Sequence, residues 1–211
     1  MIELYTWGTP NGRKASIMLE ETGLPYNVHP VNLGKNEQFD PAFLKLAPNN
    51  KIPAIIDTDG PGGPLSVFES GAILIYLAEK SGRLLAAKGP ERYKALEWLN
   101  WQMGGIGPFF GQIGYFAIRS TEKSPLAIRR FTEEGQRLIG VIDRRLQANA
   151  YLAGENYSIA DIAAYPWMFS ATTFLKSVLG PSVEAAPAVG RWLTAVGERE
   201  AVKRGMAVPK V

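Results

Sequence analysis

The first thirty residues of the chain combine two hydrophobic periods. Residues Ile2–Thr6 alternate apolar and polar side chains, as a half-buried strand does. Thr9 and Pro10 are a preferred N-cap and a preferred first helical residue, and a helical pattern then runs to about Thr22. Residues Tyr26–Leu33 predict a second strand. A strand, a helix and a strand this close together are expected to form a right-handed βαβ unit with parallel strands.

The next fifty residues predict a short helix, a hairpin and a closing helix. A helical pattern covers Pro41–Ala47, and the apolar run Pro53–Asp57 predicts a third strand. Turn residues follow, and Leu65–Phe68 predicts an antiparallel returning strand. The closing helix begins at Ser70. The order βαβ, helix, ββα predicts an α/β, thioredoxin-like domain, which we place at residues 1–81.

After residue 83 the strand patterns disappear and helical spacing remains. Glycines and Pro108 are expected to interrupt one helix, because proline removes a helix hydrogen bond and clashes with the preceding turn. Ser158 and Asp161, three residues apart, predict an acidic capping box. The other expected helices are Pro90–Gln102, Pro125–Asn149 and Pro187–Gly197. We therefore expect an all-α domain over residues 88–211, with a loose basic tail after Glu200.

Composition limits the available chemistry. The 211 residues contain 46% hydrophobic residues, one histidine and no cysteine. The chain therefore carries no disulfide, thiolate metal site or redox dithiol of its own. His29 alone does not suit a His-based metal site or a Ser-His-Asp triad, so we expect no metal. Any thiol chemistry needs a thiol that a ligand brings.

No pattern indicates a membrane or nucleic-acid partner. The uncharged run Trp98–Ile118 contains five glycines and Pro108, which favour a buried, interrupted helix over a membrane span. The N-terminus lacks the layout of a signal peptide, so we expect a cytoplasmic protein. The net charge of +3 divides into −3 over residues 1–80 and +6 over residues 81–211. A nucleic-acid face and a solvated helix surface both fit, but no run of five basic residues supports the first.

The loop before the third strand and the start of the closing helix predict a ligand. A cis bond is expected between Ile52 and Pro53, since X-Pro bonds in tight junctions are the usual place for one. The Ile52 backbone would then face outward and hold an extended peptide as an added strand would. The free N–H groups at the helix start beside Ser70 suit a carboxylate. Together these features predict a small acidic peptide as ligand.

The two predicted domains and three motifs together resemble the soluble glutathione transferases over nearly the whole chain. Within that family they are most similar to the bacterial Nu class, whose members are glutathione-dependent disulfide-bond oxidoreductases. The motifs are Thr9-Pro10-Asn11-Gly12, Pro48-Asn49-Asn50-Lys51-Ile52-Pro53 and Glu155-Asn156-Tyr157-Ser158-Ile159-Ala160-Asp161, and Phe68-Glu69-Ser70-Gly71 resembles the family's glutathione site. The resemblance implies glutathione as co-substrate, in reduced or disulfide form, and a homodimer.

The resemblance also implies roles for single residues. Thr9 and Asn11 would lie beside the sulfur of glutathione, and Glu69 and Ser70 would take the γ-glutamyl amine and carboxylate. The remaining implied ligand contacts are Gln38, Lys51, Ile52, Pro53 and Arg130. Tyr115 and Phe116 either line an apolar pocket for a second substrate or belong to the core.

A single hydrogen bond is sufficient to activate the sulfur. A free thiol has a pKa near 8.5, and lowering it by about 1.5 units needs roughly 2 kcal/mol of preference for the anion. A helix N-terminus contributes about 0.3–1 kcal/mol and a hydrogen bond to a charged group about 1.5–3 kcal/mol. Thr9 or Asn11 therefore needs only to donate to the thiolate, and neither needs to act as a base.

Several of these residues also have plain structural interpretations. Thr9 fits a helix cap, Arg130 a surface charge and His29 a structural strand residue. Lys14 and Lys51 fit solvated positions near the mouth of the site. Trp98 and Trp101 fit the core, while Tyr5 and Thr6 are near the place where other classes of the family use a hydroxyl.

Three functions follow from these interpretations. The first is reduction of disulfides with glutathione, and the second is conjugation of glutathione to electrophiles. The third is a glutathione-binding module without catalysis. The expected partners are a second copy of the chain and a small disulfide or electrophile.

Overall fold

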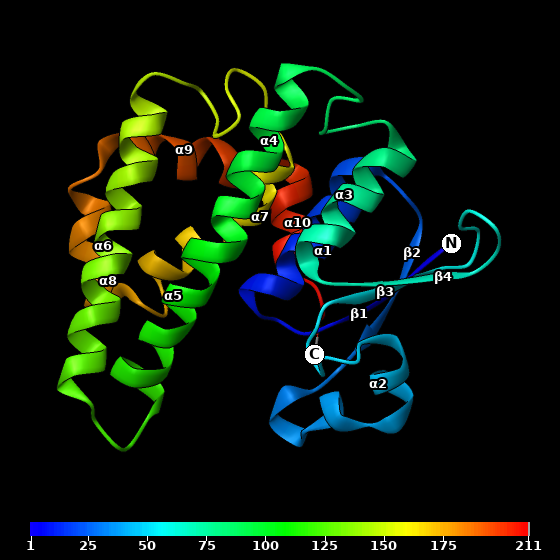
Figure 1. The fold of residues 1–211 in the computed structure, drawn as a ribbon, viewed down its shortest axis with the longest axis horizontal. Coiled ribbons are helices and arrows are strands. Elements are labelled where there is room, and N and C mark those ends of the chain that lie inside the picture. The colour runs from blue at the N-terminus through cyan, green and yellow to red at the C-terminus, as the bar shows by residue number, and fades with distance from the viewer. Residues whose placement is uncertain (211) are drawn as a thin grey trace. The chain divides into compact units, whose positions relative to one another are not determined.

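A four-stranded mixed sheet organises the first of two structural units. The computed structural model describes residues 1–210, and Figure 1 shows both units. The first unit comprises residues 1–87 and the segment that begins at Arg199, and the second comprises residues 88–198.

The sheet has the strand order β2-β1-β3-β4. β1 pairs in parallel with β2 and antiparallel with β3, and β3 pairs antiparallel with β4. The strands are β1 (Ile2–Thr6), β2 (Tyr26–Pro30), β3 (Ala54–Asp57) and β4 (Leu65–Phe68). This arrangement confirms the predicted thioredoxin-like fold of the N-terminal domain.

Helices cover both faces of this sheet. Side chains along β1 alternate, so Ile2, Leu4 and Thr6 are buried under α1 and α3, while α2 lies on the other face (Figure 1). The helices of the first unit are α1 (Pro10–Thr22), η1 (Leu33–Lys35), η2 (Glu37–Phe39), α2 (Pro41–Leu46), α3 (Ser70–Ser81) and α10 (Glu200–Met206), with η1 and η2 being 3-10 turns. The loops at the ends of β1, β3 and β4 lead into or out of these helices and carry the candidate site.

The second strand is shorter than the sequence predicts. β2 ends at Pro30 instead of Leu33. The Asn32 side chain accepts hydrogen bonds from the backbone N–H groups of Gly34 and Lys35, and this cap begins η1 where the strand was expected to continue.

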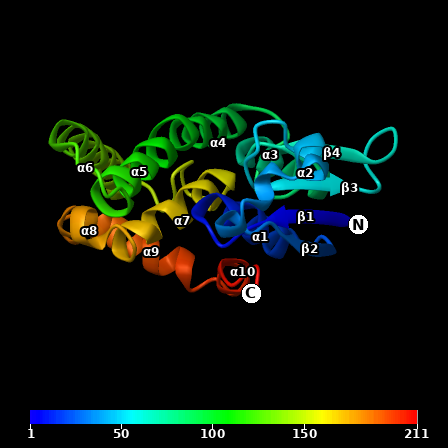
Figure 2. The same cartoon turned by 90° about the horizontal axis from the view of Figure 1, so that it is seen from below.

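The prediction of a loose tail after Glu200 is wrong. Residues Glu200–Met206 form α10, which packs against α1 (Figure 2). Ser16 Oγ donates a 2.7 Å hydrogen bond to the carbonyl of Gly205, and Arg199 binds both carboxylate oxygens of Glu21. The segment from Arg199 therefore packs with the first unit, although sequence patterning assigns it to the helical domain.

The second unit is entirely helical. Its helices are α4 (Pro90–Trp101), η3 (Gln102–Ile106), α5 (Gly107–Ile113), η4 (Gly114–Arg119), α6 (Pro125–Gln147), α7 (Ile159–Thr172), α8 (Lys176–Glu184) and α9 (Pro187–Gly197). The interruption expected near Pro108 is present: η3 and η4 are π-helical turns on either side of α5, and Pro108 lies in the first turn of α5. No helix within residues 1–210 has both the length and the apolar character needed to cross a membrane.

The predicted capping box at Ser158 also anchors the core of this unit. The buried Asp161 carboxylate accepts hydrogen bonds from the backbone N–H of Ser158 and Leu152 at 3.0 and 2.9 Å, and from Trp192 Nε1 at 2.9 Å. Burial raises the pKa of Asp161, although these donors act to lower it. One carboxylate thus ties the start of α7 to a loop and to α9.

Candidate functional site

The loop between β1 and α1 presents the start of α1. Thr9 is extended, with φ −108° and ψ 163°, and its side chain accepts a 3.2 Å hydrogen bond from the Gly12 backbone N–H. The predicted N-cap at Thr9 is therefore confirmed. This bond uses an oxygen lone pair, and the hydroxyl proton is a separate donor. Capping is thus compatible with donation to a ligand. Asn11 is half-buried in the first turn beside it.

Gly12 explains why this turn is so tight. A Cβ atom at position 12 would lie 2.1 Å from the Trp7 carbonyl oxygen and 2.5 Å from Thr6 Oγ1. Only glycine fits such an approach. Thr6 lies under this contact, fully buried, and its Oγ1 has no hydrogen-bond partner among residues 1–210.

Tyr5 and Thr6 are placed away from the loop surface. The Tyr5 ring points to the opposite face of the sheet and stacks on His29 with ring centres 4.6 Å apart. His29 Nε2 lies 2.6 Å from a Glu3 carboxylate oxygen, and this contact holds the pKa of Glu3 below its usual value. His29 is therefore held in the sheet by Tyr5 and Glu3, and the Thr6 hydroxyl is buried beneath the loop.

The loop before β3 has the predicted cis bond. The peptide between Ile52 and Pro53 is cis, and the strand begins only at Ala54. The Ile52 side chain is buried in a small core cluster with Phe43, and Trp7 packs against the same cluster. This packing fixes the Ile52 loop beside the loop that leads to Thr9. The preceding Lys51 is exposed.

The junction of β4 and α3 has an unusual backbone. Glu69 has φ 70° and ψ 116°, and it is exposed immediately before α3. A non-glycine residue at positive φ costs about 1–3 kcal/mol, and such residues concentrate at functional sites. Ser70 follows as a buried residue at the first helical position, next to the free N–H groups of the helix start.

Lys14 is a component of the site that sequence reasoning assigned wrongly. We expect a solvated lysine at this position, but its side chain is 1% exposed. Its Nζ lies 3.3 Å from Ser70 Oγ, so it joins α1 to the start of α3. Burial lowers the pKa of Lys14 to about 7, and the nearby Glu69 carboxylate acts to raise it. The detectable signal was its spacing, since Lys14 precedes the buried Ile17 and Met18 by three and four residues.

Gln38 lies in η2, in the first structural unit. Its Oε1 atom is buried and has no hydrogen-bond partner in the described chain. A buried, unsatisfied acceptor costs free energy unless a ligand or water supplies a donor.

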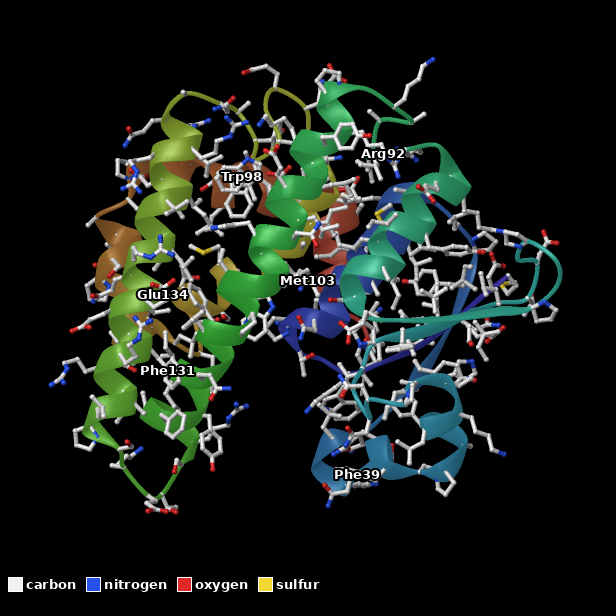
Figure 3. The ribbon with its side chains drawn as sticks, viewed as in Figure 1. Phe39, Arg92, Trp98, Met103, Phe131 and Glu134 are labelled. Carbon is white, nitrogen blue, oxygen red and sulfur yellow. The ribbon has the colours of Figure 1, made fainter. Side chains whose placement is uncertain are left out.

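The other candidate residues belong to the second unit. Arg130 is exposed on α6. Tyr115 is 51% exposed and packs edge-on against Phe116, so the core interpretation of Tyr115 is wrong. Phe116 stacks on Phe131 with ring centres 5.5 Å apart, and Figure 3 shows Phe131 between α6 and α5. Together with Phe109 these rings form an aromatic cluster.

The tryptophan pair is only partly in the core. Trp98 and Trp101 pack edge-on with ring centres 5.1 Å apart and are half-buried, and the Arg145 guanidinium lies 5.5 Å from the Trp98 ring centre. Metal binding finds no support, since no group of three or more His, Asp or Glu side chains within residues 1–210 is arranged to hold an ion.

The first unit is a thioredoxin-like domain that carries the cis Ile52–Pro53 loop and the start of α3, and the chain continues into a helical unit. The family model for the glutathione S-transferase N-terminal domain matches residues 1–79, and that for the C-terminal domain matches residues 108–200. The chain belongs to the glutathione S-transferase family.

Three relatives show which members of the family this chain is similar to. The disulfide-bond oxidoreductase YfcG of Escherichia coli is 53% identical over 171 residues, covering 80% of this chain and 79% of the relative. A glutathione transferase from Burkholderia graminis, solved with two glutathione molecules per subunit, is 47% identical with a TM-score of 0.95, covering 99% of this chain and 88% of that one. A glutathione transferase from Pseudomonas putida, solved with one glutathione disulfide per subunit, is 46% identical with a TM-score of 0.94, covering 99% and 91%.

Proposed function

We propose that the protein is a glutathione-dependent thiol-disulfide oxidoreductase of the Nu class. The observation that carries this proposal is the helix start at Thr9 and Asn11, which offers donors to a sulfur atom in a chain without cysteine. The similarity to a disulfide-bond oxidoreductase, and to structures that hold glutathione or its disulfide, supports the same activity. We further propose that the protein is a cytoplasmic homodimer.

The reaction consists of two thiol-disulfide exchanges. The thiolate of one bound glutathione attacks a sulfur of the substrate disulfide, forms a mixed disulfide and releases the first substrate thiolate. The thiolate of a second glutathione then attacks the glutathione sulfur of the mixed disulfide, forms glutathione disulfide and releases the second substrate thiolate. The protons lost by the two glutathiones end on the two product thiols. The Burkholderia graminis relative binds two glutathione molecules per subunit, the number that one turnover consumes.

The chain's own residues bind glutathione and stabilise its thiolate in this scheme. Thr9 and Asn11 donate hydrogen bonds to the sulfur at the positive end of α1. The γ-glutamyl amine binds Glu69 and its carboxylate binds Ser70 with the α3 N–H groups. The cysteinyl backbone pairs with Ile52, held by Pro53, and the remaining contacts are Lys51, Gln38 and Arg130.

The test is a paired assay on one preparation. Glutathione-dependent reduction of bis(2-hydroxyethyl) disulfide is measured beside conjugation to an aryl halide. We expect disulfide reduction to dominate. Thr9→Ala and Asn11→Ala should each lower its kcat/KM by roughly 10- to 100-fold, the value of one hydrogen bond to a charged atom.

Thr9→Ser is the matched control, since it keeps both the hydroxyl and the helix cap and should retain most activity. Lys94→Ala, at an exposed ion pair on α4, should leave the rate unchanged. A parent protein that does not reduce the disulfide would exclude the proposed activity, and binding of glutathione without turnover would identify a non-catalytic module.

Conjugation is the second candidate, and the aromatic cluster is the observation that favours it. The partly exposed Tyr115 and the stacked rings of Phe116 and Phe131 offer an apolar surface to an aromatic electrophile. Faster turnover of the aryl halide than of the disulfide, with loss in Phe116→Ala, would assign the protein to this activity.

A further inference from the structure

Lys14 is a charged side chain in an otherwise apolar position. It lies on the face of α1 that packs against α3, and it is buried together with Ile17 and Met18. Burying a lysine costs folding free energy unless its ammonium interacts with a polar or charged partner, because burial disfavours the charged form. Its Nζ reaches Ser70 Oγ, at the helix start where the glutathione carboxylate is proposed to bind.

A carboxylate at the start of α3 acts on this ammonium. Glu69, the residue immediately before α3, works to raise the pKa of Lys14. On α10, Arg199 binds Glu21, Arg204 binds Glu20, and Lys203 binds Glu200. On β1, Glu3 contacts His29. The carboxylates of Glu20 and Glu21 are thus paired with other cations, whereas the Glu69 carboxylate acts on Lys14.

We propose that Lys14 is a positioning residue for glutathione: it holds the Ser70 hydroxyl and supplies a positive charge beneath the γ-glutamyl α-carboxylate. The proposal rests on the proposed glutathione site. Lys14 would distinguish ligands that carry this carboxylate from those that lack it.

Hydrogen-bond direction gives the mechanism. An ammonium only donates, so the Ser70 oxygen accepts from Lys14 and its own proton is turned away from Nζ, toward a ligand oxygen. A neutral amine can accept instead, and the serine proton is then drawn back toward it. The carboxylate therefore binds best to protonated Lys14. Binding raises the pKa of Lys14 from about 7, and the complex takes up a proton.

The first experiment compares Lys14→Met with the parent, using two ligands measured by direct binding. One ligand is S-methylglutathione, and the other is its analogue with 4-aminobutyrate in place of the γ-glutamyl residue, which lacks only the α-carboxylate. Lys14→Met should weaken the binding of S-methylglutathione by roughly 10- to 100-fold and should change the affinity for the analogue little. Equal weakening of both ligands would indicate a purely structural role and overturn the proposal.

The second experiment counts protons. Calorimetric titrations with S-methylglutathione at about pH 8, in buffers of different ionisation enthalpy, should show that the parent takes up nearly one more proton than Lys14→Met. S-methylation removes the ligand thiol from this count. The same proton number in both proteins would overturn the proposal.

The binding of S-methylglutathione is measured independently of disulfide reduction, so the proposal for Lys14 and the proposed function can fail separately. A parent that binds S-methylglutathione but reduces no disulfide would contradict the oxidoreductase activity and leave the test of Lys14 intact. A parent that binds neither ligand would overturn both. Thermal unfolding of the variant without ligand shows whether it is folded.

Discussion

At the scale of single residues, the site combines several costly conformations and charges. Glu69 has a left-handed backbone, Gly12 has no room for a Cβ atom, and Lys14 is buried. The left-handed backbone of Glu69 and the burial of Lys14 each cost folding free energy, and position 12 accepts only glycine. All three residues lie at or near the starts of α1 and α3, where we propose that glutathione binds.

Lys14 predicts a pH dependence of stability in the absence of ligand. Its pKa is about 7 in the folded protein and near 10.5 when unfolded, so the unfolded chain binds more protons between these values. The free energy of unfolding therefore rises with pH above about 7, by up to about 1.4 kcal/mol per pH unit from this group. Lys14→Met lacks this contribution.

Urea unfolding of both proteins at several pH values between about 6 and 9 measures the difference. The stability of Lys14→Met relative to the parent should be greatest at the lowest pH and decrease as the pH rises. Parallel pH profiles would contradict the assignment of a depressed pKa to Lys14.

Part of the candidate site could be predicted from the sequence, because it depends on interactions between residues close together in the chain. The Thr9 cap and the cis bond before Pro53 follow from preferences that act within a few residues. The helical spacing of Lys14 to Ile17 and Met18 indicates a buried face, but the burial of Lys14 is completed by α3, whose Ser70 lies 56 residues further along the chain. Gly12 is similar, since the Trp7 carbonyl that excludes a side chain is placed by the folded turn.

At the scale of elements, α10 supports the helix that carries Thr9. Its Gly205 lies directly on Ile17 of α1, where a Cβ atom would approach the Ile17 Cα to 2.5 Å. Arg204 reaches Glu20, and Arg199 reaches Glu21. A helix of seven residues has little stability alone, so α10 depends on this packing. Sequence patterning missed it for that reason.

Gly205→Ala should displace α10 and destabilise the protein by about 1–3 kcal/mol, the usual cost of overpacking. Gly190→Ala is the matched control, because a Cβ atom at this position in α9 meets nothing within 4 Å. It should stabilise the protein by about 0.5–1 kcal/mol, through the better helix propensity of alanine.

Chemical unfolding of both variants measures these changes, and disulfide reduction measures the consequence for the site. Equal stability of Gly205→Ala and the parent would show that α10 does not need the close approach to Ile17.

At the scale of the whole molecule, the structural units change the meaning of the charge distribution. The net charges of −3 for residues 1–80 and +6 for residues 81–211 arise because the basic C-terminal segment is counted with the helical domain. Counted by unit, the first has 11 basic and 10 acidic residues and the second has 12 and 10. Neither unit is strongly basic, which removes the argument for a nucleic-acid face.

The proposed homodimer makes a prediction at the same scale. Phe39, on η2, is 54% exposed (Figure 3). If the interface of a symmetric dimer covers Phe39 in both copies, Phe39→Ser should raise the dimer dissociation constant by roughly 100-fold or more. Light scattering over a dilution series measures this.

Phe174→Ser is the control, because Phe174 is similarly exposed but already packs with Arg119. It should leave the dissociation constant unchanged. A monomeric parent would contradict the homodimer, and a dimer of Phe39→Ser as tight as the parent would contradict the role of Phe39.

The packing of α10 on α1 also orders events during synthesis of the chain. Residues 88–198 are an insertion between two pieces of the first unit, and α10 leaves the ribosome about 180 residues after α1. At elongation rates of about 5–20 residues per second this delay is roughly 10–40 seconds. The nascent first unit spends that time with the α10-binding surface of α1 uncovered, so α1 gains the support of α10 only after the whole second unit has been synthesised.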